Sequence, residues 1–215
     1  HSFPTRRSSD LMEEFYRITK KAINFVFLVA TPMMIYFIIF AKEGIFFLSG
    51  SAYAGSIIPM QIIMPTLLLI GLTNIMGIQM LVPLGREKIV LYSEIAGVIV
   101  DVILNALLIP KMASAGAAIG TLAAEAAVLM VQYIALRNEV RDAFKNVHYG
   151  SLVIALAVAS ILSSFIKRTS FGTFIMLCVS AIVFFGVYFG ILTVVKEPLV
   201  IDIEKQLLKK IKHSR

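Results

Sequence analysis

Three carboxylates lie in stretches of this sequence that are too apolar to form loops. Glu94 and Asp101 fall in one apolar run, and Glu125 falls in the next. Glu94, Gly97, Asp101 and Asn105 recur at steps of three and four residues, so they share one face of a helix. An ionisable group at membrane depth is costly and marks a functional site by default. We therefore expect this face to meet another helix or a water-filled cavity.

The composition indicates that these helices lie in a membrane. The chain of 215 residues is 59% hydrophobic and 15% charged, and its mean hydropathy is +0.88. Its apolar residues gather in blocks of about 20, the length that crosses a hydrocarbon core of about 30 Å. The sequence therefore predicts an all-α fold, a polytopic transmembrane helix bundle with about six spans. We expect the spans over residues 23–41, 57–82, 89–109, 112–136, 151–166 and 171–195.

The two ends of the chain differ from this transmembrane region, which we place at residues 12–195. Residues 1–11 (HSFPTRRSSDL) resemble the in-frame translation of a sequencing-library adapter, so we expect a non-native leader on a C-terminal fragment of a longer protein. Residues 196–215 form a basic tail with apolar side chains at three- and four-residue spacings. It is expected to lie along the inner leaflet as an amphipathic helix; a solvated, partly frayed tail is the alternative.

If the six spans cross the membrane one after another, the Lys and Arg residues between them lie mostly on one side of the membrane. Fourteen Lys and Arg residues fall on the side of the two termini and four on the other, with Arg6 and Arg7 completing the 20 in the sequence. Cytoplasmic loops carry the excess of such residues, so both termini are predicted to be cytoplasmic. The net charge of +7 is then explained by topology and by anionic lipid, and it does not indicate nucleic-acid binding.

Prolines and glycines predict how the helices bend and pack. Pro59 and Pro65 each remove a backbone donor and should bend or break the start of the second span, as Pro32 should in the first. Gly116 and Gly120 belong to a nearly continuous face of small residues in the fourth span. Such faces let helix backbones approach closely, so this one is expected to pack against a neighbouring helix.

The region from residue 79 to residue 118 resembles a known family. The runs QMLVPLGREK, IAGVIVDVILNALLIP and AGAAIGT are similar to the C-terminal half of an oligosaccharide (polysaccharide) flippase of the multidrug/oligosaccharidyl-lipid/polysaccharide exporter superfamily. The matching positions are Gly85, Arg86, Leu104, Asn105, Leu108–Pro110 and Gly116–Ala118. Two positions depart from the family pattern: Asp101 stands where Asn is common, and Ala113 where Gly is common.

The resemblance implies a partial second lobe of an exporter-type fold, the last six of about fourteen spans. It also implies a function: flipping an undecaprenyl-linked oligosaccharide across the bacterial cytoplasmic membrane by alternating access, for polysaccharide (capsule, O-antigen or exopolysaccharide) biosynthesis. Membrane lipids and polysaccharide-assembly enzymes are the other partners that this function implies. Candidate residues of the substrate cavity are Asp101, Asn105, Glu94, Gln79, Asn74 and Arg86, and candidates for ion coupling are Asp101 and Glu125.

Other interpretations stay open at this point. Asp101 and Glu125 also fit structural hydrogen bonding between helices, and Glu94 and Arg86 fit snorkelling to the membrane surface. A multidrug extruder of the same superfamily would use intramembrane acids as well. A membrane enzyme of polysaccharide assembly is the alternative from another class. His148 and His213 lack metal-ligand spacing and no glycine-rich phosphate loop occurs, so we expect no catalytic residue, metal or cofactor.

Overall fold

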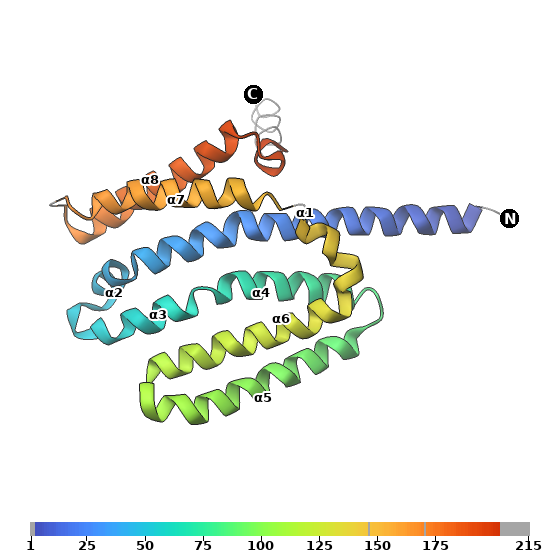
Figure 1. The fold of residues 1–215 in the computed structure, drawn as a ribbon, viewed down its shortest axis with the longest axis horizontal. Coiled ribbons are helices and arrows are strands. Elements are labelled where there is room, and N and C mark those ends of the chain that lie inside the picture. The colour runs from blue at the N-terminus through green and yellow to red at the C-terminus, as the bar shows by residue number, and fades with distance from the viewer. Residues whose placement is uncertain (1–2, 146, 170, 203–215) are drawn as a thin grey trace. The chain divides into compact units, whose positions relative to one another are not determined.

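The computed structural model describes residues 3–145, 147–169 and 171–202, with side chains from residue 10 onward, and every element in these ranges is helical (Figure 1). The elements in chain order are α1 (Phe3–Ile39), α2 (Ala41–Ser49), the 3₁₀ helix η1 (Ser51–Ser56), α3 (Ile57–Ile63), α4 (Thr66–Asn74), the π-helix η2 (Ile75–Leu81), α5 (Glu87–Met112), α6 (Ser114–Lys145), α7 (Tyr149–Ile166) and α8 (Thr173–Val194).

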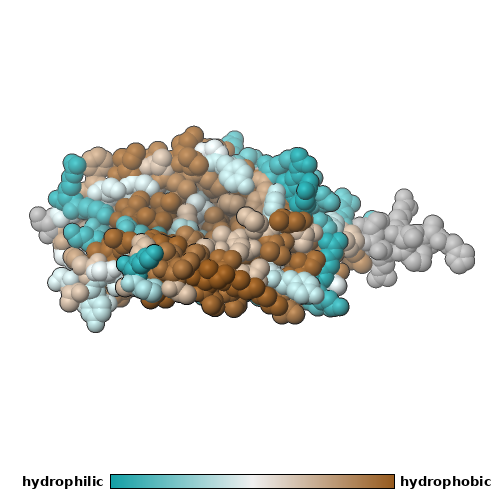
Figure 2. Space-filling view, turned by 60° about the horizontal axis from the view of Figure 1, so that its bottom comes forward, coloured by the Kyte–Doolittle hydropathy of each residue, from teal (hydrophilic) through white to brown (hydrophobic). Residues whose placement is uncertain are grey.

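Five of the described helices are long and apolar enough to cross a membrane: α1 from Asp10 onward, α5, α6, α7 and α8. A sixth crossing is present if the bent pair Ser51–Ile63 and Thr66–Leu81 counts as one span. Apolar side chains are exposed along these helices and dominate the face shown in Figure 2. An apolar exterior of this kind is stable against lipid tails and not against water. The chain is therefore a multi-pass helical membrane protein.

The chain divides into two compact units. The first unit comprises His1–Ala30 and Pro65–Val147, and the second comprises Thr31–Met64 and His148–Arg215. In the first unit, α4 and η2 pack on α6, and α5 and α6 form an antiparallel hairpin (Figure 1). Its buried core gathers Ile23, Leu72, Ile75, Met76, Met80, Leu81, Leu136, Val140 and Ala143. These residues come from four elements, so the packing fixes α6 against both α1 and the α4–η2 segment.

In the second unit, α7 and α8 form another antiparallel hairpin (Figure 1). The Tyr36 hydroxyl lies 2.9 Å from the Leu177 carbonyl, to which it donates, and 3.1 Å from the Ser180 hydroxyl. At the far end of α7, Lys167 pairs with Glu43 at 3.0 Å and donates to the Ile39 carbonyl at 2.6 Å. These bonds join α8 and the end of α7 to the segment that begins the unit.

The predicted disruption of the second span is confirmed at Pro65, which forms the N-cap of α4 at a 40° bend after α3. Pro59 lies inside the first turn of α3, where the missing N–H costs little. Pro32, in contrast, is inside α1, which continues through it without a break. The segment after α4 then widens into the π-helix η2, where the Val82 N–H donates to the Gly77 carbonyl five residues back.

Two helices extend beyond the expected spans. The fourth span was expected to end at residue 136, but α6 runs to Lys145 because Val140 and Ala143 continue its buried stripe. α1 begins at Phe3 and so includes most of the expected leader. After α8, residues 198–202 are helical; the rest of the expected amphipathic tail lies outside the described residues.

Candidate functional site

The predicted polar face of α5 lies against α6, and glycines allow the close approach. A Cβ added to Gly116 would lie 2.6 Å from the carbonyl carbon and oxygen of Leu108, and one added to Gly97 would lie 2.6 Å from the Val128 side chain. Neither position has room for a larger residue at this helix separation. The small face predicted for the fourth span therefore packs on α5, as expected.

Asp101 and Asn105 point at the same contact. A Cβ on Gly120 would overlap the Asn105 amide oxygen and would lie 3.3 Å from Oδ1 of Asp101. Both Oδ1 atoms are buried, and neither has a hydrogen-bond partner among the described residues. Buried polar atoms are almost always bonded in folded proteins, and an exception calls for a physical reason. Neither oxygen holds α5 to α6 through a hydrogen bond, so the structure does not give Asp101 the interhelical pair that was one of its two interpretations.

The three acidic side chains come together at one open pocket of about 210 Å³ between α5 and α6. We call it the acidic pocket. It is lined by Glu94, Gly97, Val98, Asp101, Thr121, Ala124, Glu125 and Val128. None of the three carboxylates forms an ion pair with any residue that the structure describes. The pocket therefore gathers three carboxyl groups without a cationic partner between apolar helices.

A second pocket, of about 250 Å³, adjoins the first on the side of α4 and η2. We call it the amide pocket. It is lined by Ile70, Thr73, Asn74, Gly77, Ile78, Val90, Glu94, Glu125 and Gln132. Glu94 and Glu125 line both pockets, so their carboxylates lie at the boundary between them. Together the pockets present carboxylate, amide and hydroxyl groups, which bind the hydroxyl groups of a sugar or a cation.

Sequence reasoning missed Gln132, which is 1% exposed. Its Nε2 donates to the Ser93 hydroxyl at 3.1 Å, and that hydroxyl donates to the Val90 carbonyl at 2.7 Å. Its Oε1 is buried and has no partner among the described residues. A signal was present in the sequence, because Thr121, Glu125, Val128 and Gln132 follow steps of four, three and four residues and so share a helical face.

Two predicted residues lie apart from the pockets. Gln79 is exposed on η2 and lines neither of them. Arg86, at the N-cap of α5, pairs with Glu139 at 3.1 Å and approaches the Ala135 carbonyl at 3.4 Å. This ion pair offsets the Arg86 charge and gives it a structural role between α5 and α6.

Within the described residues, no group of three or more His, Cys, Asp or Glu side chains is arranged to hold a metal ion. No family model, no curated protein and no solved structure matches this chain.

Proposed function

We propose that this chain is part of a transporter that flips a lipid-linked oligosaccharide across the membrane. The observation that carries the proposal is the pair of adjoining pockets in the first unit, where three carboxylates without ion-pair partners lie between apolar helices. Charge at that depth is costly, and it is retained where it contacts a transported solute or ion. The resemblance of residues 79–118 to polysaccharide flippases supplies the substrate class.

The polar groups that line the two pockets fit the sugar part of such a substrate. Carboxylate oxygens accept hydrogen bonds from sugar hydroxyls, and the amide of Asn74 both accepts and donates. The same carboxylates repel a pyrophosphate, so we assign Asp101, Glu94 and Glu125 to sugar contacts or ion coupling. The lipid tail would stay outside, against exposed apolar side chains of α5 such as Ile99 and Val102.

The test is a flipping assay on the full chain in vesicles. A lipid-linked oligosaccharide carrying a fluorescent sugar is placed in both leaflets, and a membrane-impermeant quencher is added outside. The quencher removes the outer-leaflet fluorescence at once, and the slower loss of the remaining fluorescence measures the rate of flipping. We expect Asp101→Asn, which keeps the shape and removes the charge, to slow flipping at least about tenfold. Glu87→Gln removes one charge in the first turn of α5, outside both pockets, and should leave the rate unchanged.

A multidrug extruder is the second candidate, because the acidic pocket offers three carboxyl groups without ion-pair partners to a cationic compound. The two functions differ in the compound that is transported. Vesicles that expel ethidium but do not flip the labelled lipid-linked sugar would replace the first proposal with the second. If neither substrate moves, or if one moves and Asp101→Asn leaves its rate unchanged, the pockets are not a transport site.

A further inference from the structure

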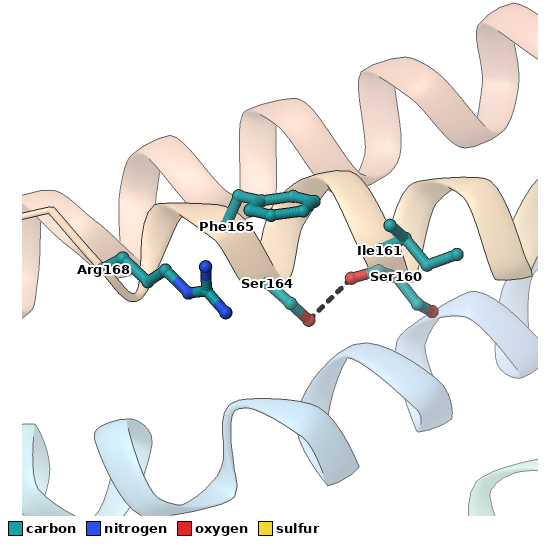
Figure 3. Close-up of a pocket in the computed structure, with 5 residues that line it drawn as sticks. All are labelled: Ser160, Ile161, Ser164, Phe165 and Arg168. Atoms are coloured by element: carbon teal, nitrogen blue, oxygen red, sulfur yellow. Dashed lines mark hydrogen bonds between the residues drawn. The ribbon is translucent and has the colours of Figure 1, made fainter.

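A hollow of about 320 Å³ lies along α7 in the second unit, and it shares no lining residue with the acidic or amide pocket. It is lined by Ser160, Ile161, Ser164, Phe165 and Arg168 (Figure 3). Ser160, Ser164 and Arg168 follow one another at four-residue steps, and Figure 3 shows their polar ends on the same side of the helix. We propose that this hollow binds a glycerophospholipid through its phosphate and ester groups.

Arg168 carries a positive charge that no carboxylate of the described residues offsets. Lys167, the neighbouring base, is occupied by Glu43 and by the Ile39 carbonyl. The Arg168 guanidinium lies 5.5 Å from the centre of the Phe165 ring and has no carboxylate partner within residues 3–145, 147–169 and 171–202. One positive charge therefore remains at this end of α7. A guanidinium presents paired N–H donors that match the oxygens of a phosphate.

A second feature is the order of the side chains along α7. Four helical residues rise about 6 Å, so Ser164 and Ser160 lie roughly one and two such steps deeper than Arg168. A glycerophospholipid presents its groups in the same order, with phosphate outermost, then ester carbonyls, then acyl chains. The hollow offers a guanidinium, then hydroxyls, with Phe165 and Ile161 as its apolar wall.

The hydrogen bonds of the serines identify which hydroxyl is available. The Ser164 hydroxyl donates to the Ser160 carbonyl at 2.7 Å, the bond drawn in Figure 3, and Ser163 donates to the same carbonyl at 3.2 Å. The Ser160 hydroxyl makes no hydrogen bond with any part of the chain that the structure describes. It is half-buried in the hollow and is the donor that an ester carbonyl would meet. A polyprenyl phosphate has no such ester, so the geometry favours a membrane phospholipid.

The experiment uses native mass spectrometry of the full chain in detergent with dioleoyl phosphatidylglycerol. Arg168→Gln should lower the ratio of lipid-bound to free protein about tenfold, and Arg168→Lys should lower it less. Lys42→Gln is the matched control for charge: Lys42 lies at the same end of the second unit, against the ring of Phe46, but outside the hollow. It should leave the ratio within about twofold of the unmodified chain.

A second pair of variants tests the ester contact. Ser160→Ala should weaken phosphatidylglycerol binding severalfold without affecting undecaprenyl phosphate, whereas Ser163→Ala, one turn away and outside the hollow, should change neither. Circular dichroism checks that each variant keeps its helices. Equal losses in Arg168→Gln and Lys42→Gln would overturn the site in favour of general electrostatic attraction. Undecaprenyl phosphate or inorganic phosphate binding as tightly as phosphatidylglycerol would overturn the assignment of the ligand.

Discussion

At the scale of single residues, the amide of Gln132 lies between α5 and the α4–η2 segment with one of its two polar atoms bonded. Together with Glu94 and Glu125 it lines the amide pocket. A buried polar atom without a partner lowers stability by about 1–3 kcal/mol. A protein selected for stability alone would place an apolar residue here. We infer that Gln132 is retained for what it binds.

This inference predicts different effects of Gln132→Leu on stability and on transport. The change removes the unpaired oxygen at similar volume, so the thermal midpoint in detergent should stay the same or rise. The rate of flipping of the lipid-linked sugar should fall at least about fivefold, because the amide pocket loses the polar side chain of Gln132. Gln79→Leu is the control, since Gln79 is exposed outside both pockets. Unchanged flipping in Gln132→Leu would mean that the residue only packs.

Ala113 gives a second prediction at this scale. Its φ of 49° and ψ of −127° connect α5 to α6 in a backbone region that suits glycine and strains a residue with a Cβ. Ala113→Gly should therefore raise the free energy of unfolding by about 1 kcal/mol. Thermal unfolding in detergent measures the change. A lower midpoint would show that the turn is not strained, and that the flexibility of glycine in the unfolded chain outweighs any relief.

At the scale of elements, the hairpin of α5 and α6 depends on the small face of α6. Gly116→Ala would place a methyl group 2.6 Å from the backbone of Leu108, which cannot rotate away. We expect it to lower the free energy of unfolding by about 1–3 kcal/mol. Gly186→Ala is the matched control: its Cβ would meet nothing within 4 Å in the middle of α8, so helix propensity should make it neutral or stabilising by up to about 1 kcal/mol. Equal effects of the two changes would contradict the close packing.

The sequence predicted the helices and the acidic face because both depend on local rules. Blocks of apolar residues set the long helices, and the spacing from Glu94 to Asn105 predicted a face turned toward another helix. The break at Pro65 followed from its missing donor. The sequence did not predict the π-helix η2 or the second pocket, because these arise from packing among α4, α5 and α6. Thr121 and Gln132 share a helical face with Glu125, but the small residues dominate the pattern of the fourth span and predict packing there, not a polar site.

At the scale of the whole molecule, the number of crossings depends on the bent pair of helices before α5. If the segment from residue 51 to residue 81 crosses the membrane, six spans place both termini on one side. If it enters and returns, five spans place them on opposite sides. Lys42 and Lys88 flank this segment, so the two arrangements differ in whether these residues face the same solution.

We predict that Lys42 and Lys88 face opposite solutions. The chain has one cysteine, Cys178, so the Cys178→Ser variant gives a background for single cysteines at each position. A membrane-impermeant maleimide added to intact cells should label Lys42→Cys and should label Lys88→Cys only after the membrane is opened. Labelling of both from outside, or of neither, would mean that the bent pair is a re-entrant loop and that the termini do not share a side.

The π-helix η2 has a consequence for how related proteins would differ in length. Its i→i+5 bond from Val82 to Gly77 accommodates one residue more than an α-helical turn. Losing one residue between positions 75 and 81 would restore α-helical hydrogen bonding there, and the flanking helices would keep their phase because the bulge absorbs the extra residue. The residues inside the bulge, among them Gly77 and Ile78 of the amide pocket, would change their positions around the helix axis. The lining of the amide pocket would then change with no substitution in the pocket itself.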